Sequence, residues 1–208
     1  MQAGGEGPYF WPWVMAGPNA VFPKPYHQFA HDYRHLDRIL ANGELVRLDI
    51  GCDVDHYNGD VGRTVPVSGT FTRGQREVVD LLAEAYRAGL SEIRDGVPVD
   101  TIVQAALRRV AELAGSMETD LGKQAVAHLL RPDGGRYFFV HSQGLASSEG
   151  SFDILRRGMV VCWEPIFAVD GQGFYLEDML LVTETGYELL TPNLPYTAAE
   201  IETFMARE

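Results

Sequence analysis

The chain has 208 residues, with 17 basic and 29 acidic side chains, 46% hydrophobic residues and a formal net charge of −12. This composition is typical of a globular chain and its length suits one domain, so we expect residues 1–208 to form a single domain. The acidic balance argues against partners that bind a basic face, so neither nucleic acid nor an anionic membrane is expected.

The sequence has no apolar run of about 20 residues, which a membrane-spanning helix needs. Its first residues, "MQAGGEGPYFWPWVMAG", lack the basic start and clean apolar run of a signal peptide, and we expect a cytoplasmic protein. Cys52 and Cys162 each lie in an apolar, strand-like run, so both are expected to be buried. Two cysteines are too few for a disulfide framework or a thiolate metal cluster.

Taken in chain order, apolar periodicity and turn residues predict strands, then helices, then strands again. Strands are predicted over residues 10–15, 45–51, 64–67, 137–141, 160–169, 174–183 and 187–190, with a loop over 16–26. Helices are predicted over 72–94, 100–114 and 121–130, with a short last helix after 197. Thr72 and Thr197 have the side chains of N-caps. This order indicates an α+β fold with an antiparallel sheet.

Two glutamates are predicted to face each other across a hairpin in "EPIFAVDGQGFYLED". Asp170-Gly171 between two strand-like runs is a strong signal for a two-residue turn. That turn places Glu164 opposite Glu177 on one face, with Cβ atoms roughly 4.5–5.5 Å apart. Glu164 also follows the apolar run "MVVCW", so the facing carboxylates are expected to be buried and to need a proton or a cation between them.

The stretch "RLDIGCDVDHYNGDVGRTVPVSG" holds a second set of carboxylates. A turn centred on residues 54–55 places Asp49 opposite Asp60. A turn at residues 58–59, an Asn-Gly pair, is the stronger local signal and instead pairs Asp49 with Ser68. Turn chemistry alone leaves both registers open and prefers the second.

His141 ends the apolar run "YFFV" just before a Gly/Ser-rich loop. By itself, a histidine at a strand end is more often a hydrogen-bonded structural residue. Together with two carboxylate pairs, however, it completes a set of mostly oxygen ligands, which suits Mn²⁺, Mg²⁺ or Fe²⁺. Two divalent cations balance four carboxylates, whereas one would leave two negative charges uncompensated, so the expected site holds two cations.

With these residues in place, the sequence resembles the pita-bread metallopeptidases of family M24, which include methionine aminopeptidase, X-Pro aminopeptidase and prolidase. The matching motifs are "LDIG…GDVGRT", "HSQGL", "GMVVCWEP" and "YLEDMLLVT", in the family's order. "GQREVVDLL" and "GPNA" resemble the X-Pro branch more than the methionine branch. The resemblance implies an α+β pita-bread fold, in which helices cover a curved antiparallel sheet, and it favours the turn at residues 54–55.

The resemblance also implies a ligand set and a reaction. The family's metal ligands fall on Asp49, Asp60, His141, Glu164 and Glu177. Asp60 and Glu177 would bridge two divalent ions, expected to be Mn²⁺ with Co, Fe or Zn as alternatives. Asp49 would complete one shell, and His141 with Glu164 the other. A water between the ions would have a lowered pKa and attack an N-terminal peptide bond, with Glu164 as the catalytic proton shuttle. The expected partner is a peptide substrate, and a homodimer is left open.

The chain departs from the family where the family binds substrate. The family's substrate-site histidines fall on Asp32, Ser148 and Tyr137, and the arginine of the X-Pro "R-x-E-D" motif falls on Tyr175. His31 could replace the first of these histidines only through a one-residue slip. We assign the four replaced positions as substrate-binding, and expect weak or altered peptidase activity.

Two other interpretations stay open. One is a metal-binding non-peptidase, or pseudoenzyme, of the same fold, which the missing histidines favour. The other is a hydrolase of a small non-peptide substrate, as creatinase is, although such members tend to lose metal ligands. The family's fold begins with helices that precede the strand predicted at residue 10, so we expect either a fragment of a longer chain or a shortened member.

Overall fold

The computed structural model describes residues 4–9, 13–21 and 39–207. Its elements, in chain order, are β1 (Gly7–Pro8), β2 (Trp13–Ala16), η1 (Gly17–Ala20), β3 (Leu45–Ile50), β4 (Cys52–Val54), β5 (Tyr57–Asn58), β6 (Val61–Pro66), α2 (Arg73–Leu90), α3 (Val99–Leu113), η3 (Ala114–Ser116), α4 (Asp120–Leu129), η4 (Gly134–Tyr137), β7 (Phe138–Ser142), β8 (Val160–Val169), β9 (Gln172–Val182), β10 (Tyr187–Leu189) and α5 (Ala198–Met205).

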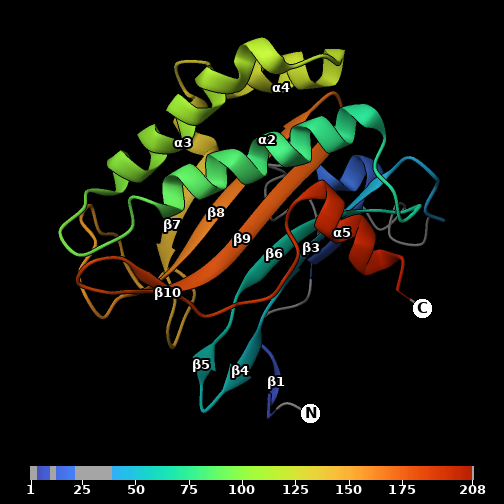
Figure 1. Cartoon of the computed structure of the whole chain (residues 1–208). Helices are drawn as coiled ribbons and strands as arrows, with labels where there is room; N and C mark the ends of the chain where they lie inside the picture. Colours follow the sequence, from blue (N-terminus) through green and yellow to red (C-terminus); the bar gives the residue numbers. More distant parts are fainter. Residues whose placement is uncertain (1–3, 10–12, 22–38, 208) are drawn as a thin grey trace.

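A large antiparallel sheet organises the molecule (Figure 1). Its strands follow the order β2-β3-β6-β9-β8-β7, with β10 alongside β9, and β1, β4 and β5 form a separate small sheet. Helices α2, α3 and α4 cover one face of the large sheet, and α5 packs against α2. The predicted α+β class with an antiparallel sheet is therefore confirmed.

The hydrophobic core lies between the helices and the face of β8 and β9 that they cover. Val78 and Tyr86 of α2 and Trp163 of β8 are at most 1% exposed. The Trp163 ring stacks on Phe138 with centroids 5.8 Å apart, and its Nε1 donates to the carbonyl of Tyr86 at 3.1 Å. Burial of such large apolar side chains is the main favourable term in folding.

The predicted N-caps Thr72 and Thr197 are confirmed. Each accepts a hydrogen bond from the N3 amide, and the side chains of Gln75 and Glu200 bond back to the cap in a capping box. Helix α2 ends at Leu90 rather than at residue 94, because the amides of Glu92 and Ile93 bond three residues back and the chain leaves the helix. None of the helices within the described residues is long and apolar enough to cross a membrane.

The hairpin of β8 and β9 has the predicted register. Every recorded pair, from residues 160 and 181 to residues 169 and 172, fits a turn at Asp170 and Gly171. These turn residues have φ angles of 50° and 70°, the left-handed conformations of a type I′ turn. The ladder on both sides therefore leaves Glu164 opposite Glu177, on one face of the sheet.

The hairpin of β3 and β6 differs from both predicted registers. Its turn consists of Asp55 and His56, with φ angles of 50° and 68°, and Asp49 pairs with Gly62 rather than with either predicted partner. Aspartate and histidine adopt the left-handed region more readily than most residues. Asp60 stays on the face of Asp49 as a diagonal neighbour, because side chains alternate with a period of two.

The burial predicted for Cys52 is wrong, whereas that of Cys162 is confirmed. Cys52 is exposed and Cys162 is 0% exposed. The reason is the position of β4, which belongs to the small sheet that projects away from the helices (Figure 1). Cys162 instead lies on β8, which has a neighbouring strand on each side in the large sheet.

A buried polar network holds the site-bearing strand from the helix side. Arg63 Nη2 lies 2.8 Å from Asp178 Oδ1, and the Tyr86 hydroxyl donates to Asp178 Oδ2 at 2.7 Å. Thr191 Oγ1 also donates to Asp178 Oδ1, at 2.6 Å. Because successive residues of a strand point to opposite faces, this network fixes β9 immediately behind Glu177.

Candidate metal centre

One row of side chains crosses the sheet on the face opposite the helices. Strand pairing places in this row, from β7 to β2, the residues Phe139, Glu164, Glu177, Gly62, Asp49 and Trp13. Three carboxylates therefore lie along one line. Gly62 separates two of them, and the ring of Tyr175 fills the space that a side chain at Gly62 would need.

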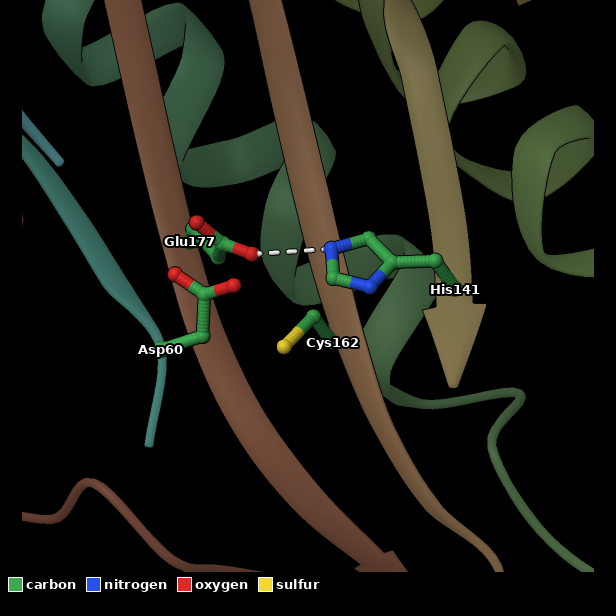
Figure 2. A group of neighbouring side chains, drawn as sticks. All are labelled: Asp60, His141, Cys162 and Glu177. Atoms are coloured by element: carbon green, nitrogen blue, oxygen red, sulfur yellow. Dashed lines mark hydrogen bonds and ion pairs between the residues drawn. The ribbon is translucent and has the colours of Figure 1, made fainter. Parts of the chain in front are cut away.

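The neighbouring row adds the imidazole. His141 pairs with Cys162, and Cys162 with Met179, so their side chains share the face of the carboxylates. Asp60 enters just before β6 begins. Figure 2 shows Asp60, His141, Cys162 and Glu177 directed toward one another, and their donor atoms all lie within 4.8 Å of one another.

All five predicted ligands line one cavity of about 500 Å³, a volume typical of small-molecule sites. These residues are Asp49, Asp60, His141, Glu164 and Glu177. Glu177 is 1% and Asp60 7% exposed, so the centre is buried at the floor of the cavity. The structure thus brings together residues that lie up to 128 positions apart in the chain.

His141 and Glu177 form the centre of the hydrogen-bond network. His141 Nε2 lies 3.1 Å from Glu177 Oε1 and 3.5 Å from Glu164 Oε2, while its Nδ1 lies 3.1 Å from the carbonyl of Ser142. The Tyr175 hydroxyl donates to the second oxygen of Glu177. A histidine whose Nδ1 donates to a carbonyl presents Nε2 for a metal, which is the usual arrangement of metal-binding histidines.

Burial and crowding raise the pKa of three acids in this cavity, Asp49, Asp60 and Glu177. The pKa of Asp49 rises to about 7, mainly through burial and then the charge of Glu177, and the pKa of Asp60 rises to about 8 for the same reasons. Burial and the charge of Glu164 also raise the pKa of Glu177. Burial opposes a charged His141, yet its bonds to Glu164 and Glu177 outweigh that effect and raise its pKa to about 11. The acids hold protons that bound cations would displace.

The donor set fits divalent cations. Asp60 Oδ1 is buried and has no hydrogen-bond partner among the described residues, which is rare for a buried carboxylate. Four carboxylates and one imidazole supply oxygen and nitrogen ligands, and two divalent cations would compensate their charge. The residues Asp49, Asp60, His141, Glu164 and Glu177 could therefore hold two cations.

The substrate positions predicted from the sequence have different locations. Ser148 and Tyr175 line the cavity. Tyr137 is not among the described residues that line it; its ring packs on His128 with centroids 4.7 Å apart and is 8% exposed, as expected of a packing residue. Asp32 lies outside the described residues.

Arg47 and Cys162 are among the residues at the site to which the sequence analysis gave no functional role. Arg47 is 2% exposed and lines the cavity, with its guanidinium 5.5 Å from the centre of the Tyr175 ring. Cys162 contributes its sulfur to the cluster of donor atoms. Each lies two positions before a predicted ligand, Asp49 or Glu164, on the same strand face. The period-two rule applied backwards from the ligands would have found both.

Without metal, the protein is expected to lose stability as the pH rises from about 5 to about 8. The folded-state pKa values of Asp49 and Asp60, about 7 and 8, lie above the ordinary value of 3.8. Their contribution to the free energy of unfolding is therefore complete below the ordinary pKa. It is lost as the pH rises through the folded-state pKa values. The pKa of His141 is raised from 6.5 to about 11, so this residue also lowers the stability as the pH rises between those values.

Thermal melts in a chelating buffer at about pH 5 and about pH 8 measure this effect. Tm should be lower at the higher pH, and saturating divalent cation should remove the difference because cations replace the protons. Starting near pH 5 avoids the titration of Glu77, Glu84 and Glu200, whose lowered pKa values affect stability at more acidic pH. A metal-free Tm that rises across this interval would contradict the assigned electrostatics.

Comparisons with known proteins find that this chain is similar to metallopeptidase family M24 and to aminopeptidases. The model of metallopeptidase family M24 matches residues 1–184. A curated relative, the Xaa-Pro aminopeptidase of Haemophilus influenzae, is 33% identical over 195 residues, covering 83% of this chain and 44% of that protein. A solved structure of zinc-substituted Escherichia coli aminopeptidase P in complex with product has a TM-score of 0.77 and 28% identity, covering 100% of this chain and 50% of that chain.

Pseudomonas aeruginosa aminopeptidase PepP is a further structural neighbour, with a TM-score of 0.74 and 29% identity over 99% of this chain and 49% of that chain. The chain thus spans about half the length, or less, of the relatives that it matches. Aminopeptidase P has the pita-bread fold, so the fold implied by the sequence resemblance is confirmed.

Proposed function

The chain belongs to metallopeptidase family M24, and from that premise we propose that its cavity is the active site of a dinuclear, metal-dependent peptidase of the X-Pro aminopeptidase or prolidase type. The observation that carries this proposal is the strand pairing, which places Glu164, Glu177 and Asp49 in one row across the sheet. His141 and Asp60 join them at the same cavity.

Each predicted ligand has a place in this proposal. Asp60 and Glu177, the two most buried acids of the group, are assigned as ligands shared by both cations. Asp49 completes the shell on the β3 side, and His141 and Glu164 complete it on the β7 and β8 side. The oxygen-rich set suits Mn²⁺ best, with Co²⁺, Fe²⁺ or Zn²⁺ as alternatives.

The side chains of the cavity have distinct tasks in hydrolysis. Two bound cations would lower the pKa of a shared water and polarise the scissile carbonyl. Glu164 is the proposed catalytic residue: it lines the cavity, and its carboxylate would take a proton from the attacking water and pass it to the leaving amine. Tyr175 donates its hydroxyl to Glu177 and so holds that ligand in one orientation.

The proposed substrate is a short peptide with proline in the second position. Relatives named Xaa-Pro aminopeptidase and Xaa-Pro dipeptidase support this class. The cavity volume of about 500 Å³ suits a di- or tripeptide end rather than a folded protein. Ser148 and Tyr175 line the cavity and are the proposed substrate-binding residues among those described.

Metal analysis combined with a peptide panel tests the proposal. The protein should bind two divalent cations per chain, and with Mn²⁺ it should cleave X-Pro dipeptides or tripeptides in preference to X-Ala analogues. A chelator should abolish both properties. Absence of stoichiometric metal binding would remove the proposed centre, whereas two bound cations without cleavage would favour the second candidate.

The second candidate is a metal-binding protein of the same fold that does not cleave peptides. The observation in its favour is Ser148, which lines the cavity at a position where the family carries a histidine. A serine hydroxyl is shorter than an imidazole and carries no charge with which to stabilise a developing oxyanion. A hydrolase of a small non-peptide substrate would share the same geometry.

Replacing Ser148 with histidine is expected to raise kcat/KM on X-Pro peptides by up to about a hundredfold, since one oxyanion-stabilising group is worth roughly 10²–10³ in rate. Ser148 has a φ of 56°, a region that histidine enters more readily than most residues. Steady-state kinetics of Ser148→His, alone and combined with Asp32→His, measures the gain.

The matched control is Ser151→His, at an exposed loop position outside the set that lines the cavity. It should leave kcat/KM unchanged. If the parent protein already turns over X-Pro peptides rapidly and Ser148→His adds nothing, other residues of this chain perform the role that the family gives to its histidines.

A further inference from the structure

Cys162 lies inside the group of donor atoms at the floor of the cavity. Its sulfur, one ring nitrogen of His141 and carboxylate oxygens of Asp60 and Glu177 are all within 4.8 Å of one another (Figure 2). The five ligands expected from the family resemblance do not include this cysteine. Its presence changes the chemistry of the donor set from oxygen and nitrogen to oxygen, nitrogen and sulfur.

Strand pairing fixes the direction of the Cys162 side chain. His141 on β7 is its direct partner, so the two Cβ atoms lie roughly 4.5–5.5 Å apart on one face. Glu164 follows two residues later on β8 and therefore shares that face. The thiol cannot turn to the helix side without breaking the ladder of β7, β8 and β9.

The separations are close to those of a metal shell. A metal–sulfur bond of about 2.3 Å and a metal–oxygen or metal–nitrogen bond of about 2.0–2.2 Å place two ligands at most about 4.5 Å apart. The spread of 4.8 Å in the cluster exceeds that limit by only a few tenths of an ångström. Small side-chain rotations are enough to bring all four atoms around one ion.

Packing alone does not account for these surroundings. A buried cysteine usually acts as a small apolar residue among other apolar side chains. Here its sulfur instead lies within 4.8 Å of donor atoms of two carboxylates and an imidazole. One of those carboxylates, Asp60, is 7% exposed, and its Oδ1 has no hydrogen-bond partner among the residues described. A buried carboxylate oxygen without a hydrogen-bond partner, on a residue of the same cluster, points to a cation site.

We infer that Cys162 supplies a thiolate ligand to the cation held by His141. This inference rests on the proposed two-cation centre and adds a ligand to it. On binding, the S–H bond breaks, its proton passes to the buffer, and the sulfur electron pair forms the bond to the cation; no electron is transferred. The divalent charge compensates the new thiolate.

A thiolate at one position makes the two cation positions unequal. The position beside Asp49 keeps oxygen ligands and suits Mn²⁺ or Mg²⁺. The position beside His141 and Cys162 combines nitrogen and sulfur, which favours Co²⁺, Zn²⁺ or Cd²⁺. Mixed loading, with a softer ion at the His141 position, is the expected consequence.

Cobalt spectroscopy tests the inference directly. Metal-free protein is titrated with Co²⁺ in a thiol-free buffer, and the near-ultraviolet band of thiolate-to-cobalt charge transfer is followed while equilibrium dialysis counts bound ions. The wild-type chain and Cys52→Ser should both show the band, and Cys162→Ser should lose it. Cys162→Ser should also bind Zn²⁺ at least about tenfold more weakly, with a smaller change for Mn²⁺.

Cys52→Ser is the matched control, because the chain has two cysteines and Cys52 is the exposed one. In that variant Cys162 is the remaining thiol, so the result stands even if Cys162→Ser does not fold. Cobalt bound in stoichiometric amount without the band overturns the thiolate ligand and leaves the proposed function intact. Failure to bind cobalt at all overturns the metal centre itself, and the proposed function with it.

Discussion

Glu177→Ala is expected to abolish hydrolysis and to weaken binding of divalent cations by at least about a hundredfold, more than the 10- to 100-fold typical of losing an outer partner of a ligand. Glu177 is 1% exposed, and its Oε1 lies 3.1 Å from His141 Nε2. Its Oε2 accepts a hydrogen bond from the Tyr175 hydroxyl. As the proposed shared ligand, Glu177 would contact both cations, so neither position would keep its full set of ligands. Isothermal titration with Mn²⁺ and a peptide assay measure the two losses.

The same substitution should have opposite effects on stability with and without metal. Cations bound at the proposed centre would stabilise the folded chain, and Glu177→Ala would lose this gain. Without metal, the substitution removes one acid from a crowded group whose charges raise one another's pKa, so Tm should stay equal or rise. Glu188→Ala, at an exposed position of β10, is the control. Equal metal-dependent shifts in Tm for the two variants would exclude Glu177 as a ligand.

The sequence predicted best where turn chemistry and strand period agreed. Asp170-Gly171 places two left-handed residues where a type I′ turn needs them, and this turn sets the register of the long strands β8 and β9. The pairing of Glu164 with Glu177 followed from that turn alone. One half of the candidate site could thus be predicted from the sequence alone.

The other half was harder to predict from the sequence, because its turn contains no glycine. Asp55 and His56 adopt left-handed conformations that sequence patterns assign mainly to Asn-Gly or Asp-Gly. The predicted turn at residues 54–55 was wrong by one residue, which shifts each partner by two positions. Asp49 and Asp60 nevertheless share a face, since a shift of two preserves the strand period. The facing set was therefore predictable although the direct partners were not.

The position of Tyr175 could not be predicted, because it depends on a close approach between two strands. A Cβ built on Gly62 would lie 1.9 Å from Tyr175 Cε1 and 2.3 Å from Cζ. The Tyr175 ring occupies space that Gly62 leaves empty. The sequence around Gly62 and the sequence around Tyr175 give no sign that these two positions are in contact.

Gly62→Ala is accordingly expected to disrupt the site as well as the packing. The added methyl group cannot be accommodated while the Tyr175 ring, 2% exposed, keeps its place beneath Arg47. Overpacking of this kind typically costs about 1–3 kcal/mol and more where a ring must leave its site. Displacement of Tyr175 also removes its hydrogen bond to Glu177, so metal affinity should fall together with stability.

Chemical denaturation and metal titration of a double-mutant cycle separate this contact from a general effect on β6. Gly59→Ala is the control, because its Cβ would meet Cys52 O at 3.4 Å, an ordinary contact, and it should change stability by less than about 0.5 kcal/mol. Tyr175→Val should relieve the clash, so the double variant Gly62→Ala with Tyr175→Val should be more stable than the single losses predict by addition. Strict additivity of the two substitutions would show that Gly62 and Tyr175 are not coupled, and that the glycine is required for a different reason.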